Sequence, residues 1–226
     1  MISLIGGVII LGDGVPANRE TLMFTLRAFT LGTHMKRSMG ATSLVYPNPV
    51  FLIGTYDEKG EPNLMTAAWA GICSSKPPAI GVSLRAATYS HGNIVARRAF
   101  TVNVPSEDLV TEADHLGMRS GRDENKFAAT GLTPVRSELV DAPFVKECPM
   151  VLECRLIDTV EVGLHTHFIG EIVDVKADEE TFDQDGVCQI SKVRPFVFAP
   201  GDRGYYRIGG RIAGAFEKDH VKLKKH

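Results

Sequence analysis

The sequence has no strong excess of either charge. Its 226 residues include 25 Lys and Arg and 27 Asp and Glu, which gives a formal net charge of -2. Proteins that bind nucleic acids usually carry a basic excess or a basic stripe. The clearest basic cluster runs from Lys218 to His226, and short tails of this kind are usually solvated chain ends. We therefore expect no nucleic acid among the partners.

A long hydrophobic run is also missing. Residues 1–11 are apolar, but the run is too short to span a bilayer. It also lacks the positively charged start and the small-residue cleavage site of a signal peptide. Met35, followed by Lys36 and Arg37, would make a natural start of its own. We expect residues 1–34 to be a non-native or poorly ordered N-terminal extension and residues 35–226 to form the domain. We also expect a cytoplasmic protein with no membrane partner.

Cysteine is scarce and scattered. The four cysteines have no CxxC spacing, so neither a structural zinc site nor a redox pair is indicated. His165 and His167 would face the same side of a strand, as metal ligands often do, but no third ligand lies at a suitable spacing. We expect no metal, and free thiols in a reducing cytoplasm. The cysteines are Cys73, Cys148, Cys154 and Cys188.

Several catalytic motifs are absent. The chain has no GxSxG elbow, Walker motif or HExxH sequence, which argues against hydrolases and nucleotide-hydrolysing enzymes. The string from Gly209 to Gly214 is close to a dinucleotide fingerprint, but Arg211 stands where the second Gly must be. Too little chain follows for a βαβ unit. The sequence therefore excludes a Rossmann site.

The residues that are present predict a mainly β protein. Runs rich in β-branched and aromatic residues indicate strands over 49–56, 63–69, 79–84, 100–104, 150–162 and 166–175. Helices are expected over 90–98, with Ser90 as N-cap, over 106–117 and, as a short turn, over 123–127. The segment 177–187 is expected to be an acidic, exposed loop. Because strand and helix do not alternate regularly, an antiparallel barrel with a few covering helices fits better than a parallel sheet.

The stretch from Asn63 to Ser90 carries most of a candidate ligand site. A helix that begins near Ser90 would expose unpaired N–H groups and a positive dipole end, which together bind phosphate. Ser83, Arg85 and Thr88 would add hydroxyl groups and a bidentate cation. The alternative is a plain N-cap beside a surface arginine.

Four further side chains have ordinary explanations of their own. Trp69 is the only tryptophan, and most tryptophans are core or interface residues. Lys126 is, by default, a solvated lysine. His165 and His167 are better explained as ordinary histidines or ligand contacts than as a metal site.

As a set, these residues resemble the flavin reductase-like, FMN-binding split-barrel family. The pattern Asn-x-Met-Thr-Ala-Ala-Trp at 63–69 is followed by Ser83-x-Arg85 and by a hydroxyl residue before x-x-Asn-Ile. Further similar segments are 103–105, 121–127, 163–173 and 206–210. The resemblance extends from about residue 35 to about residue 216, and it supports Met35 as the start of the domain.

The resemblance implies a six-stranded antiparallel Greek-key barrel, usually a homodimer, with FMN near the subunit interface. It implies that Ser83, Arg85 and Ser90 hold the phosphate. The backbone of Met65, Thr66 and Ala67 would face the isoalloxazine edge. The other implied flavin contacts are Asn63, Trp69, Lys126, His165 and Phe198.

Three functions are compatible with this resemblance. The first is a flavoprotein that carries electrons between redox partners through bound FMN. The second is an NAD(P)H-dependent FMN reductase, and the third is a non-redox regulatory module that binds flavin. In the redox functions a fixed cation or amide dipole near the flavin would stabilise its reduced form. Lys126, His165 or the amides of Thr66 and Ala67 could each supply it.

Overall fold

The computed structural model describes residues 2–5, 8–11 and 36–216, in two units, Met1–Ser43 and Leu44–His226. In the first unit, strands β1 (Ile2–Ile5) and β2 (Val8–Leu11) pair in antiparallel fashion. Residues 12–35 and the basic tail from Lys218 lie outside the described residues. The boundary that the sequence predicts at Met35 therefore stays a prediction. Among the described residues no helix is long and apolar enough to cross a membrane.

The second unit is built on one antiparallel sheet of seven strands, in the order β5-β4-β8-β11-β12-β7-β6. Six of them correspond to the predicted strands. The seventh, β6, is an edge strand of small and polar residues, which carries little β signal in the sequence. The strands are β4 (Phe51–Tyr56), β5 (Pro62–Ala67), β6 (Ala70–Ser75), β7 (Pro78–Arg85), β8 (Ala99–Val104), β11 (Met150–Val162) and β12 (His165–Ala177).

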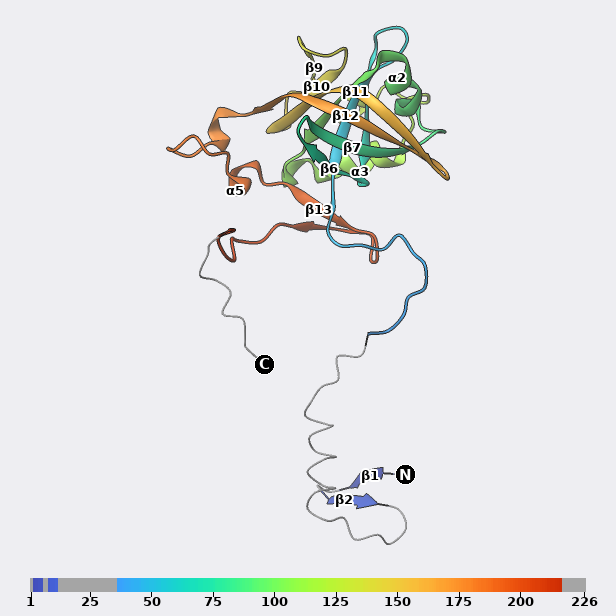
Figure 1. The fold of residues 1–226 in the computed structure, drawn as a ribbon, viewed down its shortest axis with the longest axis vertical. Coiled ribbons are helices and arrows are strands. Elements are labelled where there is room, and N and C mark those ends of the chain that lie inside the picture. The colour runs from blue at the N-terminus through green and yellow to red at the C-terminus, as the bar shows by residue number, and fades with distance from the viewer. Residues whose placement is uncertain (1, 6–7, 12–35, 217–226) are drawn as a thin grey trace. The chain divides into compact units, whose positions relative to one another are not determined.

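The sheet curls around a single inner core. β4–β5, β6–β7 and β11–β12 are hairpins, whereas β8 lies between β4 and β11, so its neighbours are distant in the chain. Ile53, Val82, Phe100 and Phe168, from four different strands, are all buried in the same cluster. The curled sheet is visible in Figure 1. A mainly β, antiparallel barrel with few helices is confirmed.

A second core lies on the outer side of β4 and β5. Successive residues of a strand face opposite sides, so Ile53 joins the inner core while Leu52 joins Leu64 in the outer one. Helix α3 (Val110–Met118), which follows the 3₁₀ turn η1 (Glu107–Leu109), and helix α4 (Lys126–Thr130) cover this side. Both elements overlap the helices predicted at 106–117 and 123–127. Ala113 and Leu116 of α3 are fully buried there.

Helix α2 (Tyr89–Arg97) begins one residue earlier than predicted, and its N-cap is Thr88 rather than Ser90. The Thr88 hydroxyl donates to the carbonyl oxygen of Arg85 at 2.9 Å instead of accepting from a helix amide. Ser90 is 1% exposed and lies inside the first turn. Within the described residues, the first-turn amides of α2 therefore have no side-chain cap.

Shorter elements complete the unit. Strands β3 (Asn48–Pro49), β13 (Phe196–Ala199) and β14 (Gly204–Arg207) form a three-stranded sheet, and β9 (Pro134–Arg136) pairs with β10 (Pro143–Val145). The predicted acidic loop contains the 3₁₀ turn η2 (Glu179–Thr181) and leads to helix α5 (Ile190–Val193).

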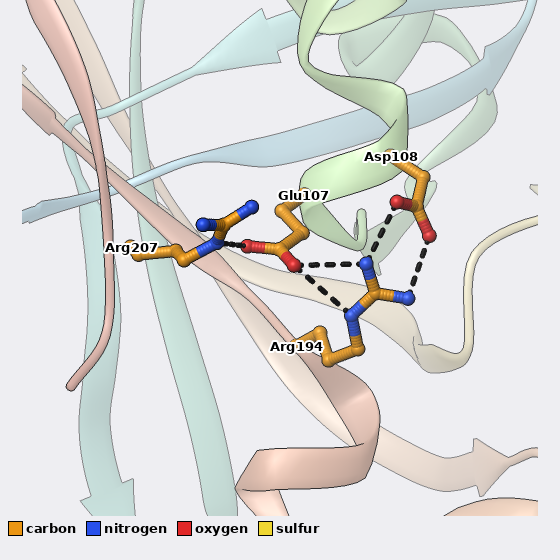
Figure 2. A network of polar contacts seen from close by, with 4 residues as sticks. All are labelled: Glu107, Asp108, Arg194 and Arg207. Atoms are coloured by element: carbon orange, nitrogen blue, oxygen red, sulfur yellow. Dashed lines mark hydrogen bonds and ion pairs between the residues drawn. The ribbon is translucent and has the colours of Figure 1, made fainter. Parts of the chain in front are cut away.

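Four charged side chains join η1 to the end of α5 and the end of β14 (Figure 2). Arg194 donates to Glu107 at 2.8 Å and to Asp108 at 2.7 Å, and Arg207 donates to the other oxygen of Glu107. Hydrogen bonds from Arg194 and Arg207 hold the pKa of Glu107 below its usual value. The chain on both sides of β13 is thus fixed to η1.

Candidate functional site

Two adjoining cavities lie beside the N-terminus of α2. The first, which we call the α2 cavity, has a volume of about 290 Å³ and is lined by Asn63, Met65, Arg85, residues 87–90, residues 116–121 and Lys126. The second, the Asp57 cavity, has a volume of about 350 Å³ and is lined by Asp57, residues 61–63, Tyr89 and residues 121–126. Asn63, Tyr89, Gly121 and Lys126 line both, so the two cavities form one continuous candidate site.

The two cavities differ in charge. The α2 cavity is lined by Arg85, Arg119 and Lys126, and no carboxylate is found in its lining within the described chain. The Asp57 cavity also contains four acidic residues: Asp57, Glu61, Asp123 and Glu124. An anion is therefore favoured at the α2 end, where the uncapped first turn of the helix adds free N–H groups and a positive dipole end.

Asn63 is held in β5 with one end of its amide paired and the other unpaired. Nδ2 donates to Ser90 Oγ at 2.9 Å and lies 3.4 Å from Thr55 Oγ1. Oδ1 is buried and has no hydrogen-bond partner within the described residues. An unpaired buried acceptor is costly, so this oxygen indicates a position for a donor from a ligand.

Gly121 keeps the space next to this oxygen open. A Cβ added at Gly121 would lie 2.1 Å from Asn63 Oδ1 and 2.6 Å from Tyr89 Cδ1. Any larger residue would fill the place where the two cavities meet. The absence of a side chain at Gly121 thus keeps the two cavities connected.

Lys126 is almost fully buried at the start of α4. Its Nζ donates to the carbonyl oxygen of Leu116 at 2.8 Å, and only 4% of the residue is exposed. Burial lowers the pKa of Lys126 to about 8, with the charge of Glu124 opposing this change. The prediction of a solvated lysine is wrong. The side chain crosses from α4 toward α3 and lines both cavities.

The predicted strand residues divide between two sides of β5. Met65 faces the α2 cavity, and Ala67 is buried in the inner core. The Thr66 hydroxyl donates to the carbonyl oxygen of Ala113 in α3, so its side chain is already occupied. The predicted backbone contacts of these three residues stay predictions.

Trp69 and His165 lie together outside both cavities. Their ring centroids are 4.8 Å apart with an interplanar angle of 44°, and Trp69 is 43% exposed. Of the two default interpretations of Trp69, a core residue is therefore wrong, and an interface residue stays a prediction. His165 is opposite Arg85 in the β7–β12 register, which places the pair next to the α2 end of the site.

Ser83 and Phe198 line neither cavity. Ser83 Oγ is hydrogen bonded to His167 Nδ1 at 2.8 Å. Phe198 belongs to β13, where its ring centroid lies 5.6 Å from that of Tyr205. Their predicted contacts with phosphate and flavin stay predictions, because neither side chain lies at the two cavities in the single chain.

The sequence does not identify Tyr89 or Arg119, and it includes Gly121 only in the similar segment 121–127, although all three line the α2 cavity. Arg119 and Gly121 belong to the segment Gly117-Met-Arg-Ser-Gly121, whose two glycines were the signal in the sequence for a close approach of the backbone.

Among the described residues no group of three or more His, Cys, Asp or Glu could hold a metal ion. Burial raises the pKa of the Cys154 thiol to about 12 and also raises that of Cys148.

The fold and the site place the chain in a known class. Residues 42–206 match the flavin reductase like domain, and the protein belongs to this family. Among solved structures, it is similar to flavoredoxin of Desulfovibrio vulgaris (Miyazaki F), with 54% identity and a TM-score of 0.78. That match covers 81% of this chain and 99% of the other. The family resemblance drawn from the sequence is confirmed.

Two more solved structures are similar over most of their length. Flavoredoxin from Methanosarcina acetivorans is 30% identical, with a TM-score of 0.76 and coverage of 81% of this chain and 97% of the other. A putative flavin reductase with a split barrel domain from Shewanella frigidimarina is 27% identical. Its TM-score is 0.69, with coverage of 89% and 98%. The predicted split-barrel fold is confirmed by this likeness.

Proposed function

We propose that this protein binds FMN at the α2 cavity and carries electrons between redox partners. The observation that carries the proposal is the meeting of an anion site and an unpaired acceptor in one cavity. The uncapped turn of α2 with Arg85 suits a phosphate, and Asn63 Oδ1 suits a hydroxyl group next to it. Membership of the flavin reductase like family and the likeness to two flavoredoxins support a flavin mononucleotide as the ligand that joins these features.

The residues present fit such a ligand. Arg85 and Thr88 are placed to receive the phosphate beside the α2 amides, and Arg119 adds a second cation in the same cavity. The ribityl chain of FMN would pass Asn63, where the absence of a side chain at Gly121 leaves room. The ring would extend along β5 past Met65, toward the exposed pair of Trp69 and His165.

Bound FMN would supply the redox chemistry, and the protein would supply orientation and electrostatics. The buried Lys126 ammonium can place a positive charge at the wall shared by the two cavities. Because its pKa is about 8, this charge is present at neutral pH and is lost in mild alkali. A fixed cation in a site shielded from water favours a ligand that gains negative charge. His165 and the amides of Thr66 and Ala67 are further candidates for this role.

We also propose that the protein acts as a homodimer in the cytoplasm. Ile72, Val162 and Leu164 are 66%, 62% and 77% exposed, and exposed apolar surface can mark a protein–protein contact. They lie on the edge strand β6 and on the β11–β12 hairpin. The four cysteines are all free thiols, which agrees with a reducing compartment.

The function is tested with purified protein and three measurements. Calorimetric titration of the flavin-free protein with FMN should give one site per chain. The bound flavin, once reduced chemically, should pass its electrons to a protein acceptor such as a cytochrome. Oxidation of NADH or NADPH with excess free FMN should be no faster than without protein.

Each outcome separates the candidate functions. If the protein binds no FMN, the flavin functions fail together. If it oxidises NADH or NADPH with many turnovers per chain, the flavin reductase function replaces the carrier. If it binds FMN that no donor reduces, a regulatory flavin-binding module is the better explanation.

A further inference from the structure

Four polar side chains are buried together beneath α2. Thr55, Asn63, Ser90 and Asn93 are between 0% and 5% exposed. Thr55 is directly opposite Asn63 in the β4–β5 register, and Ser90 and Asn93 belong to α2. Two of the four, Thr55 and Asn93, line neither of the two cavities beside α2.

Asn63 and Asn93 are joined through the hydroxyl of Thr55, and Ser90 is joined to Asn63. Asn93 Nδ2 donates to Thr55 Oγ1 at 3.1 Å, and Asn63 Nδ2 lies 3.4 Å from the same oxygen. Asn63 Nδ2 also donates to Ser90 Oγ at 2.9 Å. Both protons of the Asn63 amide nitrogen are therefore directed toward α2 and β4. A primary amide has its nitrogen and oxygen at opposite ends, so this pairing turns Oδ1 away from the cluster, toward Gly121.

The orientation of Oδ1 has no explanation within the described chain. The atom is buried and lacks a donor, while a side chain at Gly121 would occupy the space beside it. Both N–H groups of this buried amide donate to neighbouring hydroxyls, and its oxygen is unpaired at the cavity. Such an oxygen is placed to accept a hydrogen bond from a ligand.

We propose that Thr55, Ser90 and Asn93 are positioning residues, which fix the Asn63 amide so that its oxygen selects ligands carrying a hydroxyl group at this point. The inference rests on the proposed function for the identity of the ligand, where the hydroxyl belongs to the ribityl chain of FMN. It gives Ser90 a different role from the phosphate contact expected from the sequence. Ser90 acts through Asn63, and Arg85 with the α2 amides holds the phosphate.

The test uses three flavins that differ by one group each. Lumiflavin has a methyl group where riboflavin has the ribityl chain, and FMN adds a phosphate to riboflavin. The affinity ratio of riboflavin to lumiflavin measures hydroxyl recognition, and the ratio of FMN to riboflavin measures phosphate recognition. Both ratios are obtained by titrating the flavin-free full-length chain and its variants.

We expect Ser90→Ala, Thr55→Val and Asn93→Leu each to lower the ratio of riboflavin to lumiflavin by about two- to tenfold, the value of one neutral hydrogen bond. The ratio of FMN to riboflavin should stay within about twofold of the wild type in these variants. Arg85→Ala should show the reverse pattern. Thr101→Val is the matched control, because Thr101 is also fully buried but donates to the carbonyl oxygen of Pro143. It should change neither ratio.

Three results would overturn the inference. If Ser90→Ala lowers the ratio of FMN to riboflavin instead, Ser90 is a phosphate ligand. If the wild type binds flavins and neither Thr55→Val nor Asn93→Leu changes a ratio, the cluster serves only stability, and the proposed function still stands. If the wild type binds none of the three flavins, the proposed function and this inference fail together. Because ratios are compared within each variant, a general loss of stability does not imitate the expected pattern.

Discussion

The ammonium group of Lys126 donates a hydrogen bond to the carbonyl oxygen of Leu116 at 2.8 Å. This bond connects the start of α4 to the last turn of α3, and it keeps a charged group inside the protein. Such a group must titrate differently in the folded and unfolded chain, because burial lowers its pKa from 10.5 to about 8.

The first prediction is a stability that rises with pH above 8 because of Lys126. Between about pH 8 and pH 10.5 the unfolded chain keeps this proton and the folded chain has lost it. The unfolded state then binds more protons, so the free energy of unfolding increases with pH. Relative to Lys126→Met, the wild type should gain on the order of 1–3 kcal/mol across this range. Urea unfolding of the flavin-free protein at pH 7.5 and pH 10 measures the difference.

Other lysines and tyrosines titrate in the same range, so a matched control is needed. Lys76 is exposed in the β6–β7 turn, and Lys76→Met should follow the wild type at both pH values. Equal pH dependence of the wild type and Lys126→Met would mean that the lysine is solvated after all.

The second prediction concerns the two ends of α2. Arg85 lines the cavity at the N-terminal end, whereas Arg98 is the C-cap at the other end. Arg85→Ala should weaken FMN binding by about ten- to a hundredfold, the usual value of a charge-assisted hydrogen bond. Arg98→Ala should change it by less than about threefold. Equal effects in a calorimetric titration would place the phosphate elsewhere.

The third prediction uses the close approach at Gly121. The Cβ of Gly121→Ala would lie 2.1 Å from Asn63 Oδ1, so either the side chain or the backbone must move and the cavity must narrow. FMN affinity should fall at least about tenfold, a change of about 1.4 kcal/mol. Gly92→Ala is the control, since a Cβ there meets nothing within 4 Å. Retained affinity in Gly121→Ala would show that the ligand does not pass this point.

The fourth prediction concerns the contact between Trp69 and His165. Loss of the imidazole ring in His165→Ala should cost about 0.5–1.5 kcal/mol of stability. Because Trp69 is the only tryptophan, its fluorescence reports this site alone, and the emission should shift to longer wavelength as the indole gains water. His91→Ala, which removes the ring next to Phe168, should leave the emission unchanged. An unshifted emission in His165→Ala would argue against the contact in solution.

The fifth prediction tests the proposed dimer. Leu164→Asp places a charge at the exposed tip of the β11–β12 hairpin and should convert dimers to monomers in sedimentation experiments. Leu139→Asp is the matched control, because Leu139 is 51% exposed in a loop before β10, and it should leave the mass unchanged. A wild-type protein that sediments as a monomer would contradict the dimer itself.

The barrel could be predicted from the sequence because its strands carry their own signals. β4, β8 and β11 are rich in Val, Ile, Leu and Phe, and β4 and β11 each end at a turn whereas β8 stops at Pro105. β6 has no such signal, since its small residues Ala70, Gly71 and Ser74 become a strand only by pairing with β7. Its pairing is a tertiary effect, which local propensity does not record.

Part of the predicted set of site residues lies together in the structure. Asn63, Met65, Arg85, Ser90 and Lys126 do meet at one cavity. In the sequence, a hydroxyl residue near the start of a helix has the same pattern whether it caps the helix or accepts a hydrogen bond from another side chain. The Ser90 hydroxyl accepts a hydrogen bond from the Asn63 side chain. Phe198 was predicted at the ring, yet its place depends on how β13 packs against β14 and β3. No local pattern in the sequence carries that information.

The outer core has a consequence for biosynthesis. Most of its buried residues lie between Val50 and Val151, but Phe196 completes it from β13, and the contacts of Glu107 with Arg194 and Arg207 join the same two regions (Figure 2). Contacts so distant in sequence form late. Until Phe196 has been synthesised, the outer core that α3 and α4 cover lacks one of its buried residues. Completion of the α3 wall of the α2 cavity, which includes Leu116 of the same core, therefore depends on a residue that is translated long after α3.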